Sequence, residues 1–277
     1  DFMIRKITRT SATAFEVSTF AFDETTANDQ KFQPYFAFAT SGTTLTPSAT
    51  SGSGVTLTTS TNYFNSAHVG TIIRYKGNEI LITGFTSATQ ATGTVRKTLV
   101  GTTADTDFDE ASYSDYRGYP QAITFHEDRL WLGGTTSQPD AIWSSKTSEY
   151  FNFDVGSAGD SDSIQMTINV GEFNNIRHLT ANRDLQIFTT TSELYIPSFA
   201  DKGLTPTNAQ IRRQTPYGAS FVKPLPFDGA TLYVQKTGKT IREFLFSDKE
   251  SAYVSTPLSL ISSHLISNPT QMASVKG

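Results

Sequence analysis

Short apolar runs alternate with polar turns through the second half of the chain. Residues 122–125 are mostly apolar, the charged residues 126–129 follow, and residues 130–132 form the next apolar run. After two glycines and a polar loop, a third apolar run occupies residues 141–143. Tight turns between short strands are typical of a meandering antiparallel sheet, in which each strand pairs with its sequence neighbour. This pattern predicts three antiparallel strands here.

The same rhythm returns twice, in residues 174–196 and in residues 221–246. Equivalent apolar positions recur 55 and 47 residues apart, at Leu130, Leu185 and Leu232. Repeats of about 40 to 50 residues with about four strands each are typical of β-propeller blades. We therefore predict that residues 119–277 form antiparallel propeller blades.

The predicted propeller is incomplete. A closed propeller has at least about four blades, and the pattern supplies three. The chain also begins at Asp1, without an initiator Met or a charged-then-apolar leader. We therefore expect a piece of a longer product that carries a partial propeller. The alternative is a small open β protein with irregular ends.

The first half of the chain predicts a separate group of strands. Residues 34–101 are rich in Thr, Ser and Gly, and the tip Lys76-Gly77-Asn78 between two apolar runs is a strong hairpin signal. Residues 87–90 give a second turn. Such short strands fit a small SH3-like or Ig-like β-barrel insertion. Residues 4–22 alternate polar and apolar positions with no turn partner nearby, so we expect the N-terminal strands of residues 1–33 to pair with a distant sheet.

Residues 102–118 are rich in acidic and small side chains, which predicts a linker without a core of its own. Three aspartates in it alternate like the first oxygen ligands of a calcium-binding loop, at Asp105, Asp107 and Asp109. An EF-hand loop next requires Gly at its sixth position and Glu at its twelfth, where this chain has Glu110 and Tyr116. We therefore favour a solvated acidic linker, with a calcium site as the alternative.

Composition narrows the fold and the class of partner. The 277 residues include 20 Phe and 11 Tyr, and no window shows a helical apolar stripe, so we predict an all-β fold. A net charge of −4 argues against a broad basic surface for nucleic acid. The absence of Cys rules out disulfides and thiolate metal sites, and no apolar run is long enough for a membrane-spanning segment.

No catalytic motif stands out. His126-Glu127-Asp128 combines acid and base groups, but a hairpin tip explains it better. The four histidines lack the HExxH spacing of a zinc site; they are His68, His126, His178 and His264. The sialidase Asp-box and the GxSxG nucleophile elbow are absent, and no Gly-rich phosphate loop follows a strand. We therefore predict no catalytic residue, no cofactor and no metal site.

Two residue pairs have simpler structural interpretations. Trp131 and Trp143 lie in predicted apolar strands, so we expect both in the core rather than stacked on carbohydrate. Arg212 and Arg213 are adjacent, and neighbouring side chains on a strand point to opposite faces, which disfavours a joint phosphate clamp. We expect a salt bridge between blades or between subunits instead.

Four stretches carry a family resemblance. They are RGYPQAITFHEDRLWLGGTTSQPDAIWSSKTSEYFNF, GLTPTNAQIRRQTPYG and GATLYVQKTGKTIREFLF, followed by SAYVSTPLSLISSHLI. In this order they resemble the tail nozzle family of short-tailed bacteriophages and prophages, also called tail tubular protein B. TLTPSATSGSGVTLTTSTNYFNSAHVGTIIRY is similar to the small β insertion of that family. The resemblance spans about residues 34–271, and family members are usually much longer.

The resemblance implies a structural protein of the virion tail. Its members form a hexameric ring that extends the DNA-ejection channel beyond the tail adaptor ring and supports tail fibres. It implies no enzymatic activity, since the family pattern supplies no catalytic residue to carry over. Double-stranded DNA would pass through without specific binding, so we expect channel-facing residues to be acidic or neutral on balance.

Two other functions stay open. A tail-associated polysaccharide or peptidoglycan hydrolase would degrade host polysaccharide as a purified protein. A host-receptor-binding module would bind cells or glycans as an isolated domain.

Overall fold

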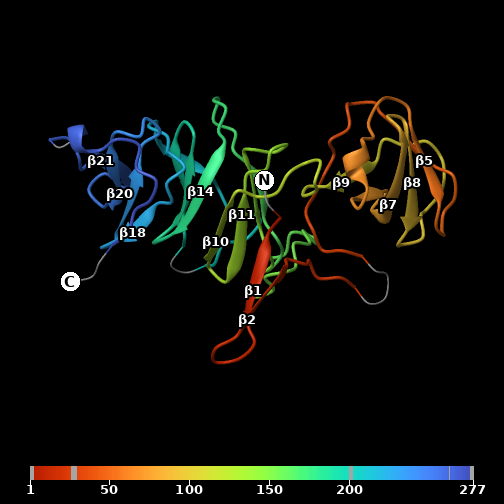
Figure 1. Cartoon of the computed structure of the whole chain (residues 1–277), viewed down its shortest axis with the longest axis horizontal. Helices are drawn as coiled ribbons and strands as arrows, with labels where there is room; N and C mark the ends of the chain where they lie inside the picture. The colour runs from red at the N-terminus through yellow and green to blue at the C-terminus, as the bar shows by residue number, and fades with distance from the viewer. Residues whose placement is uncertain (1–2, 26–29, 200–201, 262, 275–277) are drawn as a thin grey trace. The chain divides into compact units, whose positions relative to one another are not determined.

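The computed structural model describes residues 3–25, 30–199, 202–261 and 263–274 (Figure 1). The fold is all-β: 21 strands form several antiparallel sheets, and the two described helices are single 3-10 turns, η1 (Ser66–His68) and η2 (Ser263–Leu265). Neither helix has the length or the apolar character needed to cross a membrane. The chain divides into two compact units, Asp1–Tyr119 and Pro120–Gly277, which we describe separately.

The first unit is built on one seven-stranded antiparallel sheet. In spatial order its strands are β3 (Tyr35–Phe36), β9 (Phe108–Ala111), β6 (Ile72–Tyr75), β7 (Asn78–Ser87), β8 (Gln90–Val95), β5 (Val55–Thr59) and β4 (Leu45–Pro47). Buried apolar side chains from these strands, among them Leu57, Ile73 and Ile80, form one core cluster.

The predicted closed barrel is corrected, because none of the described sheets closes. The two edge strands, β3 with two residues and β4 with three, do not pair with each other. A single backbone bridge from Leu45 to Asp105 links the β4 edge to the segment before β9. The described sheet therefore stays open.

Both predicted turns of this unit are confirmed. Tyr75 pairs with Asn78 across a two-residue turn in which Lys76 (φ 49°) and Gly77 (φ 76°) are both left-handed. Left-handed geometry at both central positions matches the twist of a tight hairpin. Ser87 pairs with Gln90 at the next turn.

The expected acidic linker is wrong in its middle, because β9 lies within residues 102–118 and pairs with both β3 and β6. Phe108 and Glu110 are two positions apart on this strand, so their side chains lie on the same face, and both are buried. Basic partners neutralise the acidic side chains: Arg74 pairs with Asp109, and Arg117 pairs with Glu110 at 2.7 Å. An acidic composition does not exclude a core strand when each carboxylate finds a cation.

The N-terminal strands also differ from expectation. β1 (Arg5–Arg9) and β2 (Phe15–Thr19) pair with each other as a two-stranded hairpin rather than with a distant sheet. The connecting turn is closed by a hydrogen bond from Thr10 N to Ala14 O of 3.0 Å and by the Ser11 hydroxyl, which accepts from Ala14 N at 3.1 Å. A turn between the two strands was therefore present in the sequence, but it is a five-residue loop without Gly or Pro, so it carried no turn signal.

The second unit contains three four-stranded antiparallel sheets, and every strand pairs with its sequence neighbour. Sheet I comprises β10 (Ala122–His126), β11 (Arg129–Gly133), β12 (Ala141–Ser144) and β13 (Gln165–Thr167). Sheet II comprises β14 (Ile176–Ala181), β15 (Leu185–Thr189), β16 (Glu193–Ile196) and β17 (Arg212–Thr215). Sheet III comprises β18 (Leu225–Phe227), β19 (Ala230–Val234), β20 (Ile241–Ser247) and β21 (Ala252–Pro257). The predicted repeat of short antiparallel strands is confirmed.

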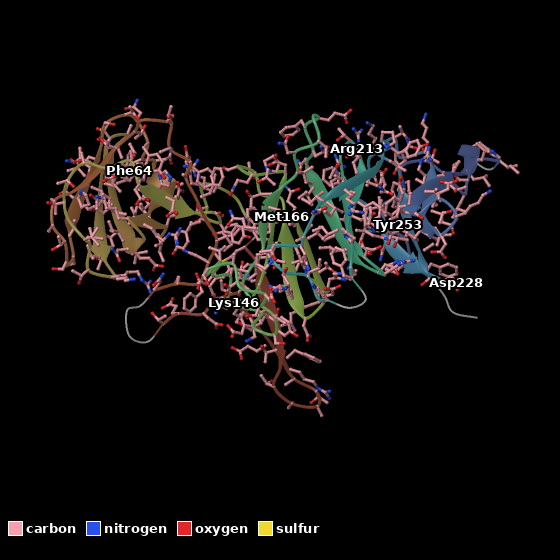
Figure 2. All side chains as sticks on the ribbon, turned by 180° about the vertical axis from the view of Figure 1, so that it is seen from behind. Phe64, Lys146, Met166, Arg213, Asp228 and Tyr253 are labelled. Atoms are coloured by element: carbon pink, nitrogen blue, oxygen red, sulfur yellow. The ribbon has the colours of Figure 1, made fainter. Side chains whose placement is uncertain are left out.

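Two cores join these sheets in chain order. Trp131 of sheet I and Leu179 of sheet II belong to one apolar cluster. An aromatic cluster joins sheets II and III, where the rings of Phe188 and Tyr233 lie 5.1 Å apart. Within it, Tyr253, which is labelled in Figure 2, stacks on Phe244 at a centroid distance of 4.6 Å. Sheet II is therefore buried on both faces.

The prediction that both tryptophans are buried is confirmed, with Trp131 fully buried and Trp143 1% exposed. The Trp131 indole N–H donates to the carbonyl of His126 at 3.1 Å, so its polar atom is satisfied inside the core.

Candidate functional site

A polar cavity of about 440 Å³ lies in the second unit where three loops meet. Glu127 comes from the β10–β11 turn, Asp160 from the β12–β13 loop, and Lys202 and Asn208 from the β16–β17 loop. Three threonine side chains complete the polar lining, from Thr147, Thr205 and Thr207. A concave site with convergent carboxylate, ammonium, amide and hydroxyl groups is the default place to look for binding or acid–base chemistry.

The β10–β11 turn presents the first of these groups. His126 pairs with Arg129, so Glu127 (φ 47°) and Asp128 (φ 54°) form a two-residue hairpin tip with left-handed backbone at both positions. Such turns favour Asn and Gly, so a Glu-Asp tip needs support from its surroundings. The Glu127 carboxylate accepts from Leu204 N at 2.7 Å, and Ser148 N donates to the Asp128 carbonyl at 2.8 Å. The predicted hairpin tip is confirmed.

Arg129 joins the loops beneath the cavity, and its side chain is only 1% exposed. Its guanidinium donates to the backbone carbonyls of Ser145 at 2.8 Å, Asp160 at 2.8 Å, Asp162 at 2.6 Å and Leu204 at 3.2 Å. A fifth, longer bond reaches the carbonyl of Ser161 at 3.5 Å. Burial lowers the pKa of Arg129, although Glu127 and Asp162 act in the opposite direction. The planar fork of donors suits this task, because it serves several carbonyls from one fixed position.

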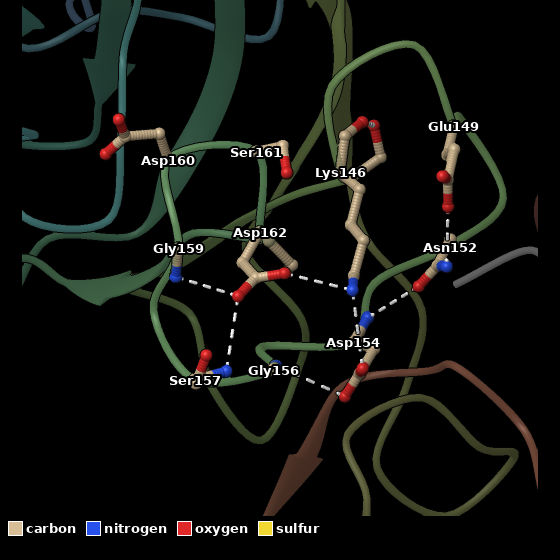
Figure 3. A network of polar contacts seen from close by, with 12 residues as sticks. Lys146, Glu149, Asn152, Asp154, Gly156, Ser157, Gly159, Asp160, Ser161 and Asp162 are labelled. Carbon is tan, nitrogen blue, oxygen red and sulfur yellow. Dashed lines mark hydrogen bonds and ion pairs between the residues drawn. The ribbon is translucent and has the colours of Figure 1, made fainter.

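Lys146 organises the β12–β13 loop (Figure 3). Its ammonium lies 3.0 Å from Asp162 Oδ1 and 3.5 Å from Asp154 Oδ2. The other Asp162 oxygen accepts from the backbone N–H groups of Ser157 at 3.2 Å and Gly159 at 2.8 Å. The hydrogen bond from Lys146 lowers the pKa of Asp162. Lys146 thus places its positive charge between two carboxylates, and these contacts within the loop hold it together.

Asp160 differs from its acidic neighbours in this loop. Its side chain points away from Lys146 in Figure 3, and it is exposed and lines the cavity. The backbone around it is fixed, because the Asp160 carbonyl accepts from Arg129. Asp160 is therefore the carboxylate of the loop that is presented to the cavity.

One nucleophile–base pair lies beside the cavity. His126 Nε2 and Ser198 Oγ are 2.9 Å apart, which is the distance expected for a serine activated by a general base. Burial lowers the pKa of His126, which favours the neutral, basic imidazole. The N–H of Ser198, however, donates to Asp184 Oδ1 at 2.8 Å, so it is not available to stabilise an oxyanion. The geometry fits a polar strut between sheets I and II better than a catalytic dyad.

The three aspartates of the calcium alternative have other partners. Asp105 lies 2.6 Å from Lys76 Nζ, and Asp109 pairs with Arg74. The carbonyl of Asp107 accepts from Lys76 N at 2.9 Å. Across the described residues, no group of three or more acidic, His or Cys side chains converges as a metal site would require. The structure therefore gives the calcium alternative no support.

The remaining candidates are dispersed. Arg213, labelled in Figure 2, pairs with Glu172 at 3.1 Å, which links β17 to the segment before β14 of the same sheet, and no described ion pair includes Arg212. His68 lies 3.2 Å from Glu110 in the first unit, and His178 lies 3.1 Å from the carbonyl of Ser220 in the second. None of the histidines shares a site with another in the described chain.

Sequence reasoning missed Arg129, Lys146, Asp160, Lys202 and Ser198. One signal was present: an arginine stands directly before a buried apolar strand at residues 130–132, and a charge there needs many partners. The other four lie in polar loops, where nothing local marks them.

Comparison with known proteins adds no assignment. No model of a known protein family matches the chain, and no curated protein matches it. The geometry and the resemblance noted above therefore carry the functional argument.

Proposed function

We propose that this chain is a non-enzymatic structural subunit of the tail nozzle of a short-tailed bacteriophage or prophage. In this proposal sheets I, II and III are consecutive blades of a partial β-propeller in the virion tail. Six copies form a ring that extends the DNA-ejection channel, contacts the tail adaptor ring and supports fibre attachment.

The serial packing of the three sheets carries the proposal. Each sheet is a four-stranded meander, and each packs on the next through its own apolar cluster. Radial repetition of four-stranded sheets is the building plan of propellers, and it leaves only short strand edges exposed. A rigid unit of this kind suits a conduit wall, which must resist pressure without aggregating.

Sheet III supports further assembly. Because Phe244 of β20 packs toward sheet II, the adjacent Leu245 faces the opposite side of the sheet. Leu245 is 38% exposed and Phe227 of β18 is 48% exposed. Exposed apolar faces mark interaction surfaces. We propose that a neighbouring copy packs here, in a head-to-tail contact that closes into a ring.

The charge of the chain supports a conduit rather than a nucleic-acid-binding protein. A net charge of −4 disfavours the counterion-release binding that would hold DNA in place. In the proposed ring, acidic or neutral residues face the channel and lysines and arginines lie at subunit contacts.

The cavity beside Glu127 supports a loop junction more than a hydrolase. The Glu127 carboxylate already accepts a hydrogen bond from the backbone N–H of Leu204. The backbone N–H of Ser198, beside the cavity, already donates to Asp184. Glycoside hydrolysis needs two carboxylates free to act on one bond. A tail-associated hydrolase is the alternative outcome of the test below.

The test is electron microscopy of the purified protein and of particles that carry it. We expect a six-fold ring with a lumen wide enough for duplex DNA. Leu245→Asp should shift the protein to smaller species, whereas Val100→Asp, at an exposed apolar position of the first unit (69% exposed), should not. A monomer with measurable turnover on host polysaccharide, or a lumen too narrow for a duplex, would overturn the proposal.

A further inference from the structure

A second cavity, of about 510 Å³, lies in the second unit between sheets II and III. It is lined at the strand ends opposite to those whose connecting loops line the first cavity. Its charged lining consists of Arg177 from β14 and Lys236 from the β19–β20 turn. Phe221, Val222 and Pro269 give it an apolar wall, and Ser220, Asn268 and Thr270 add polar groups. Among the described residues, the lining contains two cations and no carboxylate.

Arg177 is held in place but not neutralised. Its guanidinium lies 3.7 Å from the centroid of the Phe221 ring. Its Nε is buried without a hydrogen-bond acceptor, and none of the described residues forms an ion pair with it. Burial lowers the pKa of Arg177, as expected of a cation desolvated without a counter-charge.

Other arginines of this chain that lie over aromatic rings have the hydrogen-bond acceptor for which Arg177 has no described equivalent. Several more arginines lie over aromatic rings and also donate to a carboxylate, amide or carbonyl oxygen, among them Arg74, Arg117, Arg183 and Arg242. Arg177 has the ring without the acceptor. An arginine oriented by stacking, with its donors free to meet a planar oxyanion, is a typical recognition element.

The surroundings of Arg177 are positive as well. His178 lies beside it, and burial together with the charges of Arg177 and Lys223 lowers the pKa of His178 to about 4, despite the opposing hydrogen bond to Ser220. His178 is therefore neutral near pH 7. Lys236 is exposed and has no described ion partner, and Asn268 N donates to the Gly238 carbonyl at 2.8 Å, which fixes residues 268–270 at the cavity.

The size and lining of the cavity favour an acidic peptide over nucleic acid as the anionic partner. Two cations beside exposed Phe221 (77%) make a local site, whereas nucleic acid needs a broad basic surface that this acidic chain lacks. Apolar and charged groups side by side suit an acidic peptide with apolar neighbours. We propose that this cavity binds the carboxylate of an Asp or Glu on a partner protein, between Arg177 and Lys236. The proposal does not depend on the nozzle assignment.

The test measures peptide binding to the whole chain. The probe is a labelled acetyl-Leu-Asp-Leu-Asp-amide peptide, followed by fluorescence anisotropy, with its Asn-containing counterpart and duplex DNA as further arms. We expect saturable binding of the Asp peptide, at least about tenfold weaker binding of the Asn peptide, and about tenfold losses for Arg177→Gln and for Lys236→Gln.

Lys249→Gln, at an exposed position of the β20–β21 turn, is the matched control and should bind as the parent chain does. Because Lys236 is exposed, its substitution keeps the test valid even if Arg177→Gln fails to fold. Equal binding of the Asn peptide, no saturable binding at millimolar peptide, or preferential binding of duplex DNA through these two residues would each overturn the proposal.

Discussion

Arg129 offers the sharpest test of how the second unit holds its loops. Its buried guanidinium donates to the carbonyls of Ser145, Asp160, Asp162 and Leu204. Arg129→Ala removes these donors together, and the loops that carry the four carbonyls lose their common anchor. The side-chain stem also leaves a space next to sheet I, because the residue is 1% exposed.

The cost follows from the geometry. A buried acceptor that loses its donor costs about 1 to 3 kcal/mol, but water can reach loop carbonyls once the side chain is gone. Removal of the desolvated charge itself gives some free energy back, because burial disfavours the guanidinium. We therefore expect Arg129→Ala to lower the free energy of unfolding by about 3 to 5 kcal/mol, the net of several lost buried hydrogen bonds at about 1 to 3 kcal/mol each and of these two offsets.

The assay is urea unfolding followed by tryptophan fluorescence. The two tryptophans, at 131 and 143, both lie in sheet I, so this signal reports the second unit of the intact chain. Arg129→Lys keeps the charge without the fork and should give an intermediate loss. Arg213→Ala breaks a partly exposed ion pair and should cost less than about 1 kcal/mol.

Two results would refute this reasoning. One is an Arg129→Ala chain whose free energy of unfolding stays within about 1 kcal/mol of the parent value. The other is an equal loss for Arg213→Ala, which would mean that burial and multiple acceptors give Arg129 no special weight.

Three further predictions concern the buried Trp131, the stability of the first unit at low pH and the effect of calcium on the melting temperature. Trp131→Ala should cost about 3 to 5 kcal/mol, and an unchanged thermal melt would contradict its core position. Burial would raise the pKa of Glu110, but His68, which lies 3.2 Å away, and the hydrogen-bonded Arg117 guanidinium outweigh it and hold the pKa below its usual value. Its contribution to stability is therefore present above pH 4.5 and lost as the pH falls below, so hydrogen exchange of residues 72–75 should accelerate in acid, and less so in Glu110→Gln. Calcium should leave the melting temperature unchanged, because residues 105–109 form no shared site; a rise would revive the calcium alternative.

The sequence by itself determined the local structure of this protein. Alternating apolar positions and turn residues predicted the hairpin at Lys76-Gly77, the tip at Glu127-Asp128 and the repeat of short antiparallel strands. The same pattern placed Trp131 and Trp143 in the core. These features depend on residues a few positions apart, whose backbone preferences and side-chain alternation can be read from the chain alone.

Pairing between distant segments was decided only in the tertiary structure. β9 lies in an acidic stretch that looks like a linker, and it becomes a core strand because Arg74 and Arg117 come to its carboxylates from elsewhere. The absence of a closed barrel has the same origin, since closure depends on whether β3 and β4 can reach each other. Composition reports the charges of a segment but not the partners that neutralise them.

The candidate sites were the least accessible to sequence reasoning. Ser198 meets His126 across 72 residues, and Arg129 is held by backbone carbonyls, which every residue possesses and no pattern distinguishes. Arg177 is notable only because the fold places an aromatic ring against its guanidinium and, within the described residues, leaves its buried Nε without an acceptor. A site made of loop backbone and long-range contacts exists only once the sheets have brought those loops together, which is why the tertiary structure alone decided it.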